Sequence, residues 1–191
     1  MKRDRWFYSV AGAGFIIAML IGFRAFVARG SGAGDRAIDP TIFRLDLIHG
    51  LAITAWFVLF FVQSLLITVR NRKLHTKLGW SVLPVALAIA ITGTMVAIRS
   101  VQISPPNFHF FGMLYSRFLL PMLTEIGVFT LFVTIAVFKR RTPQIHRAAM
   151  LLGTSACWLA PLLACPSWFP SSATPVCMVS SDQSSFLALC C

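Results

Sequence analysis

The stretch from Leu47 to Trp80, LIHGLAITAWFVLFFVQSLLITVRNRKLHTKLGW, decides the fold of this chain. Between Leu47 and Val69 the only ionisable residue is His49. A helix needs about 20 apolar residues to cross the hydrocarbon core of a bilayer, so this part predicts a membrane-spanning helix. The rest, Arg70 to Lys77, predicts a short cationic turn that carries His75 to the mouth of the next apolar run.

The composition excludes an ordinary soluble domain. Of the 191 residues, 57% are hydrophobic and only 12% are charged, and the mean hydropathy is +0.77. Soluble domains are about half apolar and about a quarter charged. The net charge of +11 does not predict nucleic-acid binding, because the cations lie mostly between apolar runs, as they do in membrane proteins.

The apolar runs predict an all-α integral membrane protein with five transmembrane helices. The expected spans lie near residues 6–27, 47–69, 80–98, 118–138 and 148–165. Polar loops are expected at 24–44 and 99–117. Because short connections join successive spans, the last four are expected to form an antiparallel bundle. Residues 1–165 thus form one transmembrane domain, and the Ser-, Pro- and Cys-rich segment 166–191 is expected to be a disordered tail.

The distribution of Lys and Arg predicts the orientation. The loops on the side of the amino terminus carry more cations than the loops on the other side, and positive loops stay in the cytoplasm. The cations on the first side are Lys2, Arg3, Arg5, Arg70, Arg72, Lys73, Lys77, Lys139, Arg140, Arg141 and Arg147. We therefore expect a cytoplasmic amino terminus in a plasma membrane, with anionic lipid at these basic loops.

Four polar residues within the predicted spans are candidate functional residues. His49, Trp56 and Gln63 are seven residues apart, so they share one helical face and should point at protein rather than lipid. Glu125 is the only charged residue of the fourth span. Because His49 and Glu125 lie at similar depths, we expect them to meet, either as a functional pair or as a structural hydrogen bond between helices.

The order of these motifs resembles a family of uncharacterised bacterial multi-pass membrane proteins. The resemblance rests on H-G, then Trp and Gln, then H-x-x-L-G at His75–Gly79, then H-R at His146 and Arg147. It covers about residues 45–153 and implies a bacterial inner-membrane helical bundle without an assigned activity. More loosely, the chain resembles four-helix b-type cytochromes of the b561 kind, in which paired histidines hold haem.

His75 and His146 are the candidate cofactor ligands. Each follows a basic turn and opens a span from the same face, and a bis-histidine haem requires two imidazoles at one depth. Nearby Lys and Arg side chains would suit haem propionates. The alternative is that both histidines belong only to the basic loops. No metal-ion cluster is predicted.

Two functions follow from these residues. The first is a small redox membrane protein that holds haem b through His75 and His146. The alternative is a non-catalytic binding or coupling protein, or a proton relay, built around His49 and Glu125 and associated with a second copy or a partner subunit. No catalytic residues are predicted, since the chain contains no G-x-S-x-G, no H-E-x-x-H and no phosphate-binding glycine loop.

Overall fold

The computed structural model describes residues 3–29, 39–110 and 113–163. The predicted tail, 166–191, lies outside the described residues. The described chain is helical except for one small hairpin. Five long helices are present, as the sequence predicts: α1 (Arg3–Arg29), α2 (Pro40–Thr68), α4 (Val82–Gln102), α5 (Leu119–Phe138) and α6 (Pro143–Leu163).

Helix α2 begins at Pro40, earlier than the expected start at Leu47. The side chain of Asp39 accepts hydrogen bonds from the Thr41 backbone N (2.8 Å) and from Thr41 Oγ1 (2.7 Å). An N-capping Asp followed by Pro at the first helical position is a strong helix start. The hydropathy pattern therefore marked where the apolar part begins, not where the helix begins, and Asp46 lies inside α2.

The expected cationic turn from Arg70 to Lys77 is wrong beyond Asn71. Arg70 reverses the chain with a φ of 64°, and the short helix α3 (Arg72–Gly79) follows. The Asn71 side chain caps α3 by accepting a hydrogen bond from Leu74 N at 3.2 Å. Leu, Lys and Arg are good helix formers, so the basic residues extend into a helical turn rather than a loop.

The expected loop at 99–117 is also wrong in part. Helix α4 continues to Gln102, and an antiparallel hairpin follows, formed by β1 (His109–Phe110) and β2 (Met113–Leu114). A 3-10 turn, η2 (Tyr115–Phe118), then leads directly into α5. The connection between α4 and α5 thus contains short regular elements.

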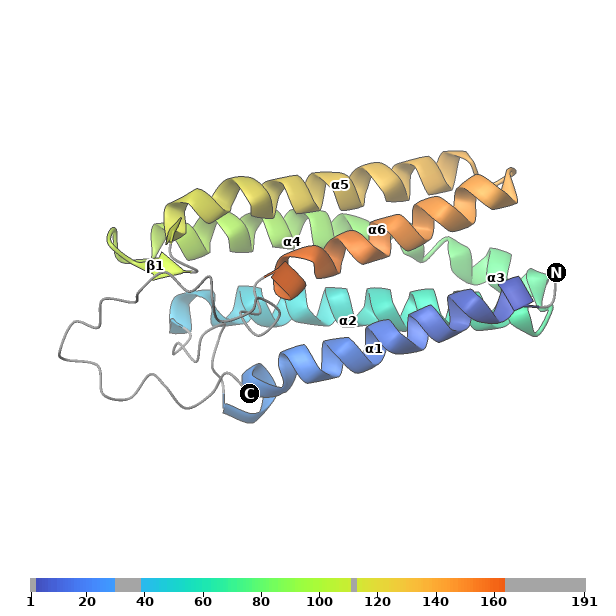
Figure 1. Ribbon diagram of the computed structural model, residues 1–191, viewed down its shortest axis with the longest axis horizontal. Coiled ribbons are helices and arrows are strands. Elements are labelled where there is room, and N and C mark those ends of the chain that lie inside the picture. Colours follow the sequence, from blue (N-terminus) through green and yellow to red (C-terminus); the bar gives the residue numbers. More distant parts are fainter. Residues whose placement is uncertain (1–2, 30–38, 111–112, 164–191) are drawn as a thin grey trace, which may run out of the picture.

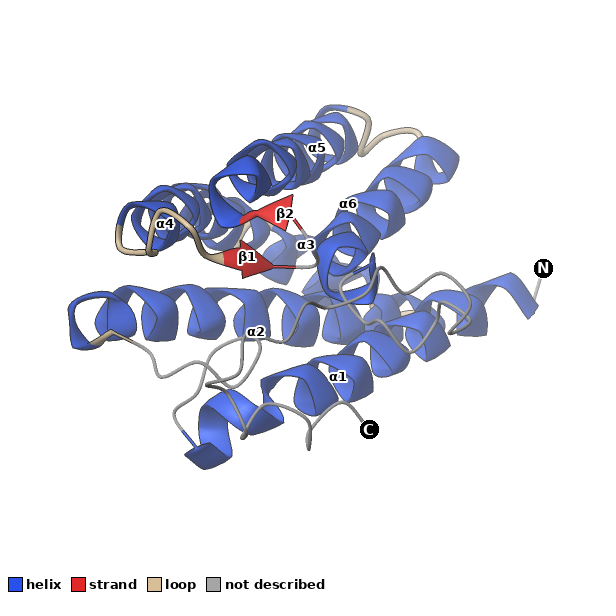
Figure 2. Cartoon of the chain, turned by 60° about the vertical axis from the view of Figure 1, so that its left-hand side comes forward, coloured by secondary structure: helices blue, strands red, loops and turns tan. Residues whose placement is uncertain are grey.

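Each long helix packs against the next one along the chain. The pairs are α1 with α2, α2 with α4, α4 with α5, and α5 with α6, and α3 packs against α2 (Figure 1). Helix α3 and the α5–α6 connection lie at the right-hand end of Figure 1, whereas the hairpin lies at the other end. Figure 2 shows the two strands of the hairpin, in red, beside the helices.

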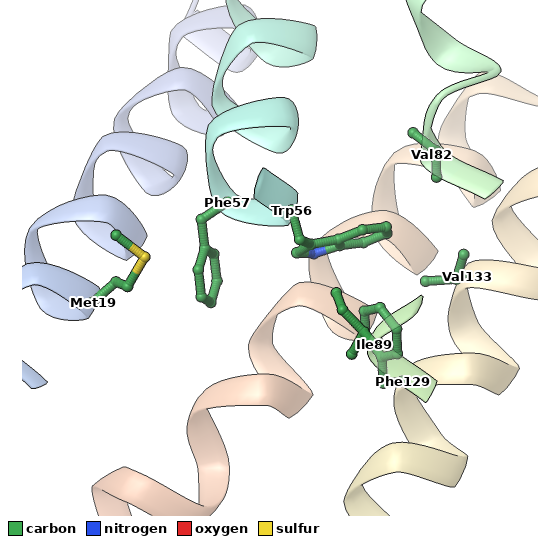
Figure 3. Packing of buried hydrophobic residues seen from close by; sticks show 7 residues of the cluster. All are labelled: Met19, Trp56, Phe57, Val82, Ile89, Phe129 and Val133. Carbon is green, nitrogen blue, oxygen red and sulfur yellow. The ribbon is translucent and has the colours of Figure 1, made fainter. Parts of the chain in front are cut away.

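The core lies where these helices meet, and it is built around the indole of Trp56 on α2. Trp56 is 1% exposed, and Phe129 of α5 packs edge-on against it with ring centres 4.8 Å apart. The indole Nε1 donates a hydrogen bond to Thr154 Oγ1 of α6 at 3.3 Å. The cluster consists of Met19, Trp56, Phe57, Val82, Ile89, Phe129 and Val133 (Figure 3).

Three segments are long and apolar enough to cross a membrane: Pro40–Thr68, Arg72–Gln102 and Tyr115–Phe138. Helix α1 has a shorter apolar stretch, Trp6–Ile21. Many large apolar side chains are exposed along these helices, including Leu120 at 74% and Phe138 at 80%. Such a surface is expected of helices that face lipid, since apolar patches of this extent are rare on soluble monomers.

Candidate functional site

The three polar residues spaced along α2 do face the interior, as their spacing predicts. Trp56 and Gln63 are buried, at 1% and 6% exposed, and His49 is half-buried. Each side chain forms a hydrogen bond with a different helix. Gln63 reaches α3, Trp56 reaches α6, and His49 reaches α4. This face of α2 therefore links two candidate sites near the opposite ends of the helix.

At one end, His75 of α3 and His146 of α6 lie together. Their ring centres are 6.5 Å apart and the ring planes are inclined by 84°. His146 lies in the first turn of α6, and its Nδ1 donates a hydrogen bond to the carbonyl oxygen of Ala136 at 2.9 Å. A proton fixed on Nδ1 leaves the lone pair of His146 on Nε2, which is the arrangement found in metal-bound histidines.

Gln63 is the neighbour that orients His75. With the amide placed so that both its polar atoms are satisfied, Nε2 donates to His75 Nδ1 and to the His75 carbonyl oxygen (3.2 Å). The amide oxygen accepts from Gly79 N at 2.9 Å. In this orientation the proton of a neutral His75 resides on Nε2. Turning the amide over would let its oxygen accept from Nδ1–H and would free the Nε2 lone pair, but it would also place that oxygen against the His75 carbonyl oxygen and the NH2 group against the Gly79 N–H.

Cationic residues lie close to this pair in the sequence. The guanidinium of Arg140 lies over the Trp80 ring, 5.1 Å from its centre. Arg147 Nε donates to the Pro143 carbonyl at 3.0 Å, which holds the side chain beside the first turn of α6. Lys77 lies in the last turn of α3 and is exposed. Lys77 and Arg147, two residues after His75 and one after His146, are thus cationic residues able to bind carboxylates.

The second site is a half-open cavity of about 330 Å³ at the hairpin end of the bundle. Residues of α2, α4, η2, α5 and α6 line it. The lining residues are Asp46, His49, Ile53, Ile89, Gly93, Val96, Ala97, Ser100, Tyr115, Met122, Glu125, Ile126, Phe129 and Cys157. The cavity therefore combines apolar walls with two carboxyl groups and an imidazole.

His49 is held in one tautomer in this cavity. Thr92 Oγ1 donates its proton to the Ala88 carbonyl oxygen at 2.6 Å, so it accepts from His49 Nδ1, which lies 2.9 Å away. A proton on Nδ1 leaves Nε2 of the neutral ring as an acceptor. Gly93 makes room for the ring, because a Cβ on Gly93 would lie 2.9 Å from His49 Cε1.

His49 and Glu125 were expected to contact each other, and the structure brings them only to the same cavity. Both side chains line it, but the hydrogen bond of His49 goes to Thr92. Asp46 and Thr92 are the residues that the sequence reasoning missed. Asp46 was placed outside the span because α2 was expected to start at Leu47, and Thr92 carries no pattern that distinguishes it from other helix threonines.

Within residues 3–29, 39–110 and 113–163, no group of three or more His, Cys, Asp or Glu side chains is placed to hold a metal ion. The remaining histidine, His109, is exposed, and its Nδ1 donates a hydrogen bond to the Asn107 carbonyl oxygen at 2.8 Å. Comparison of the chain with known protein families, curated proteins and solved structures finds no match.

Proposed function

We propose that the chain is a multi-pass protein of a bacterial inner membrane. In this proposal all five long helices cross the bilayer, and α2, α4, α5 and α6 form an antiparallel bundle with α1 against α2. The support is the length and apolar character of three of these segments, together with the exposed apolar side chains along the helices. Lipid would cover those side chains, since lipid tails solvate apolar surface and water does not.

Reporter fusions test the proposed orientation. Fusions at Arg72 and Arg141 are expected to report the cytoplasm and a fusion at Asn107 the opposite side, because the basic connections are retained inside. The measurement is the paired activity of a reporter active only in the cytoplasm and one active only outside. A periplasmic signal at Arg72 would contradict the orientation.

For function, we propose a small redox protein that binds haem b between His75 and His146. The observation that carries this proposal is the 6.5 Å separation of the two ring centres. A bis-histidine haem is held by two imidazoles, and His75 and His146 are the two that lie together here. The donor set fits as well, since haem iron needs two protein ligands whereas a structural zinc site needs four.

Different residues of the chain would bind the iron and the propionates of the haem. His146, oriented by the Ala136 carbonyl, offers Nε2 directly, and His75 offers Nε2 once the Gln63 amide turns over. Lys77 and Arg147, which are near His75 and His146 in the sequence, would neutralise the propionate carboxylates. Bound haem would supply one-electron transfer, and the protein would tune its potential through these hydrogen bonds and charges.

A visible spectrum of the purified full chain from haem-replete cells tests this function. We expect a red protein whose reduced form has a b-type spectrum with about one haem per chain. The cofactor content is measured by extraction alongside the spectrum. Colourless protein, from cells that load another b-type cytochrome under the same conditions, would refute the proposal.

Substitution of Gln63 tests how His75 is oriented. Gln63→Leu is expected to weaken haem binding about 10- to 100-fold, the usual cost of losing a partner of a metal-binding histidine. Gln63→Glu should retain haem and lower its midpoint potential, because a carboxylate accepts a stronger hydrogen bond from Nδ1–H. Thr130→Ala, on the exposed face of α5, is the control. Equal haem affinity in Gln63→Leu and the control would show that Gln63 does not orient His75 for haem binding.

A second function is favoured by the cavity that His49 and Glu125 share. In this proposal the chain is a binding or coupling protein, or a proton relay, and it works with a second copy or a partner subunit. Ionisable side chains in an apolar helical bundle are expensive and usually mark such sites. This function requires no cofactor, so the spectrum that tests haem binding separates the two.

A further inference from the structure

We infer that the cavity at the hairpin end of the bundle binds a small organic cation, namely a protonated amine attached to an apolar group. This inference deepens the second function above and is independent of haem binding. It rests on the acidic residues of the cavity wall, on the apolar residues that make up most of the rest of the wall, and on the fixed tautomer of His49.

The charged residues described in the lining of the cavity are acidic. Asp46 and Glu125 line the same cavity, and no Lys or Arg is among the described residues that line it. Neither carboxyl group forms a hydrogen bond or an ion pair with the residues that the structure describes. A carboxylate away from bulk water is costly unless a charge or a donor compensates it. An occupant with a positive charge and N–H donors would provide both.

The rest of the lining selects an organic cation rather than a metal ion. The described part of the chain brings no three metal-ligating groups close enough for one ion. The volume, about 330 Å³, lies at the small end of the range for ligand pockets, about 300–1,000 Å³. Met122, Ile126 and Phe129 supply an apolar wall, and an aromatic face attracts a cation.

His49 completes the recognition. Because Nδ1 donates to Thr92, the neutral ring retains only an acceptor, Nε2, for a further hydrogen bond. An ammonium group has three donors and no acceptor, so it matches one imidazole nitrogen and two carboxylates. An anion would find no cationic partner among the described residues that line the cavity.

The experiment compares benzylammonium with benzyl alcohol, which is nearly the same size and uncharged. Binding to the detergent-solubilised full chain is measured by equilibrium dialysis. We expect benzylammonium to bind at least tenfold more tightly, because a hydrogen bond to a charged group contributes more than the neutral bond that replaces it. Equal binding of the two probes would overturn the inference, and so would failure of benzylammonium to bind.

Variants then locate the site. Glu125→Gln and Asp46→Asn keep the size of each side chain and should each weaken benzylammonium binding about tenfold while leaving benzyl alcohol unaffected. Gly93→Ala leaves the carboxyls in place but forces the His49 ring to move, since its Cβ would lie 2.9 Å from Cε1, and should weaken binding as well. His75→Ala, at the other end of the bundle, should not.

These outcomes separate the cavity from the haem proposal. Loss of amine discrimination in Glu125→Gln with an unchanged visible spectrum supports the cavity alone. Unchanged binding in Glu125→Gln, Asp46→Asn and Gly93→Ala, with each variant folded by circular dichroism, would overturn the inference. A colourless wild-type protein that still discriminates the amine would refute haem binding and leave the cation site intact.

Discussion

Replacing either His75 or His146 by alanine is expected to abolish the b-type spectrum completely. Each ring would supply one of the two protein ligands of the haem iron, so the loss of one ring removes half of the protein's ligands. The structure places no third histidine near the pair, because His49 lies in the cavity near the opposite end of α2 and His109 is exposed beside the hairpin. The measurement is the reduced-minus-oxidised difference spectrum at equal protein concentration.

His109→Ala is the matched control for these variants. Its Nδ1 is engaged with the Asn107 carbonyl oxygen in the hairpin, far along the chain from the ring pair, and its removal should leave the spectrum intact. A spectrum that survives in both His75→Ala and His146→Ala would contradict the proposed ligation. So would a loss of the spectrum in His109→Ala alone.

Trp56→Ala is expected to destabilise the bundle by about 3–5 kcal/mol, the usual cost of removing a large buried aromatic side chain. The indole is 1% exposed, packs edge-on against Phe129 and donates to Thr154, so its loss opens a cavity and removes a hydrogen bond between α2 and α6. Unfolding by a denaturing detergent, followed by circular dichroism, measures the change.

Trp80→Ala provides a comparison with the same chemical change at the surface. Trp80 is 57% exposed and its described ring contact is the Arg140 guanidinium. An exposed cation–π contact contributes about 0.5–1 kcal/mol, so this variant should lose much less stability. Equal losses in the two tryptophan variants would show that the core is not organised around Trp56.

The five long helices were predictable because long apolar runs leave the chain few alternatives. Their ends were less predictable, since the ends depend on local capping. Asp39 and Pro40 start α2 well before its apolar part, and Asn71 turns an expected basic loop into α3. Hydropathy carries little information about such caps, because the residues that form them are polar and also common in loops.

For the candidate sites, the main residues were predictable from the sequence but their hydrogen-bonding partners were not. The seven-residue spacing identified the buried face of α2, and the position of His75 and His146 after basic turns anticipated that they lie close together. The partners of these residues were not predictable, because each depends on how two helices are rotated about their axes. Thr92 beside His49, the Ala136 carbonyl beside His146, and Asp46 in the cavity are such partners.

The buried face of α2 has a consequence for any ligands at its two ends. Gln63 contacts His75, His49 lines the cavity, and about 21 Å of one continuous helix separates Gln63 from His49. A ligand that shifts or rotates α2 at one end would change the geometry, and so the affinity, of the site at the other end. Thermodynamic linkage then requires reciprocity: the factor by which an amine changes haem affinity equals the factor by which haem changes amine affinity.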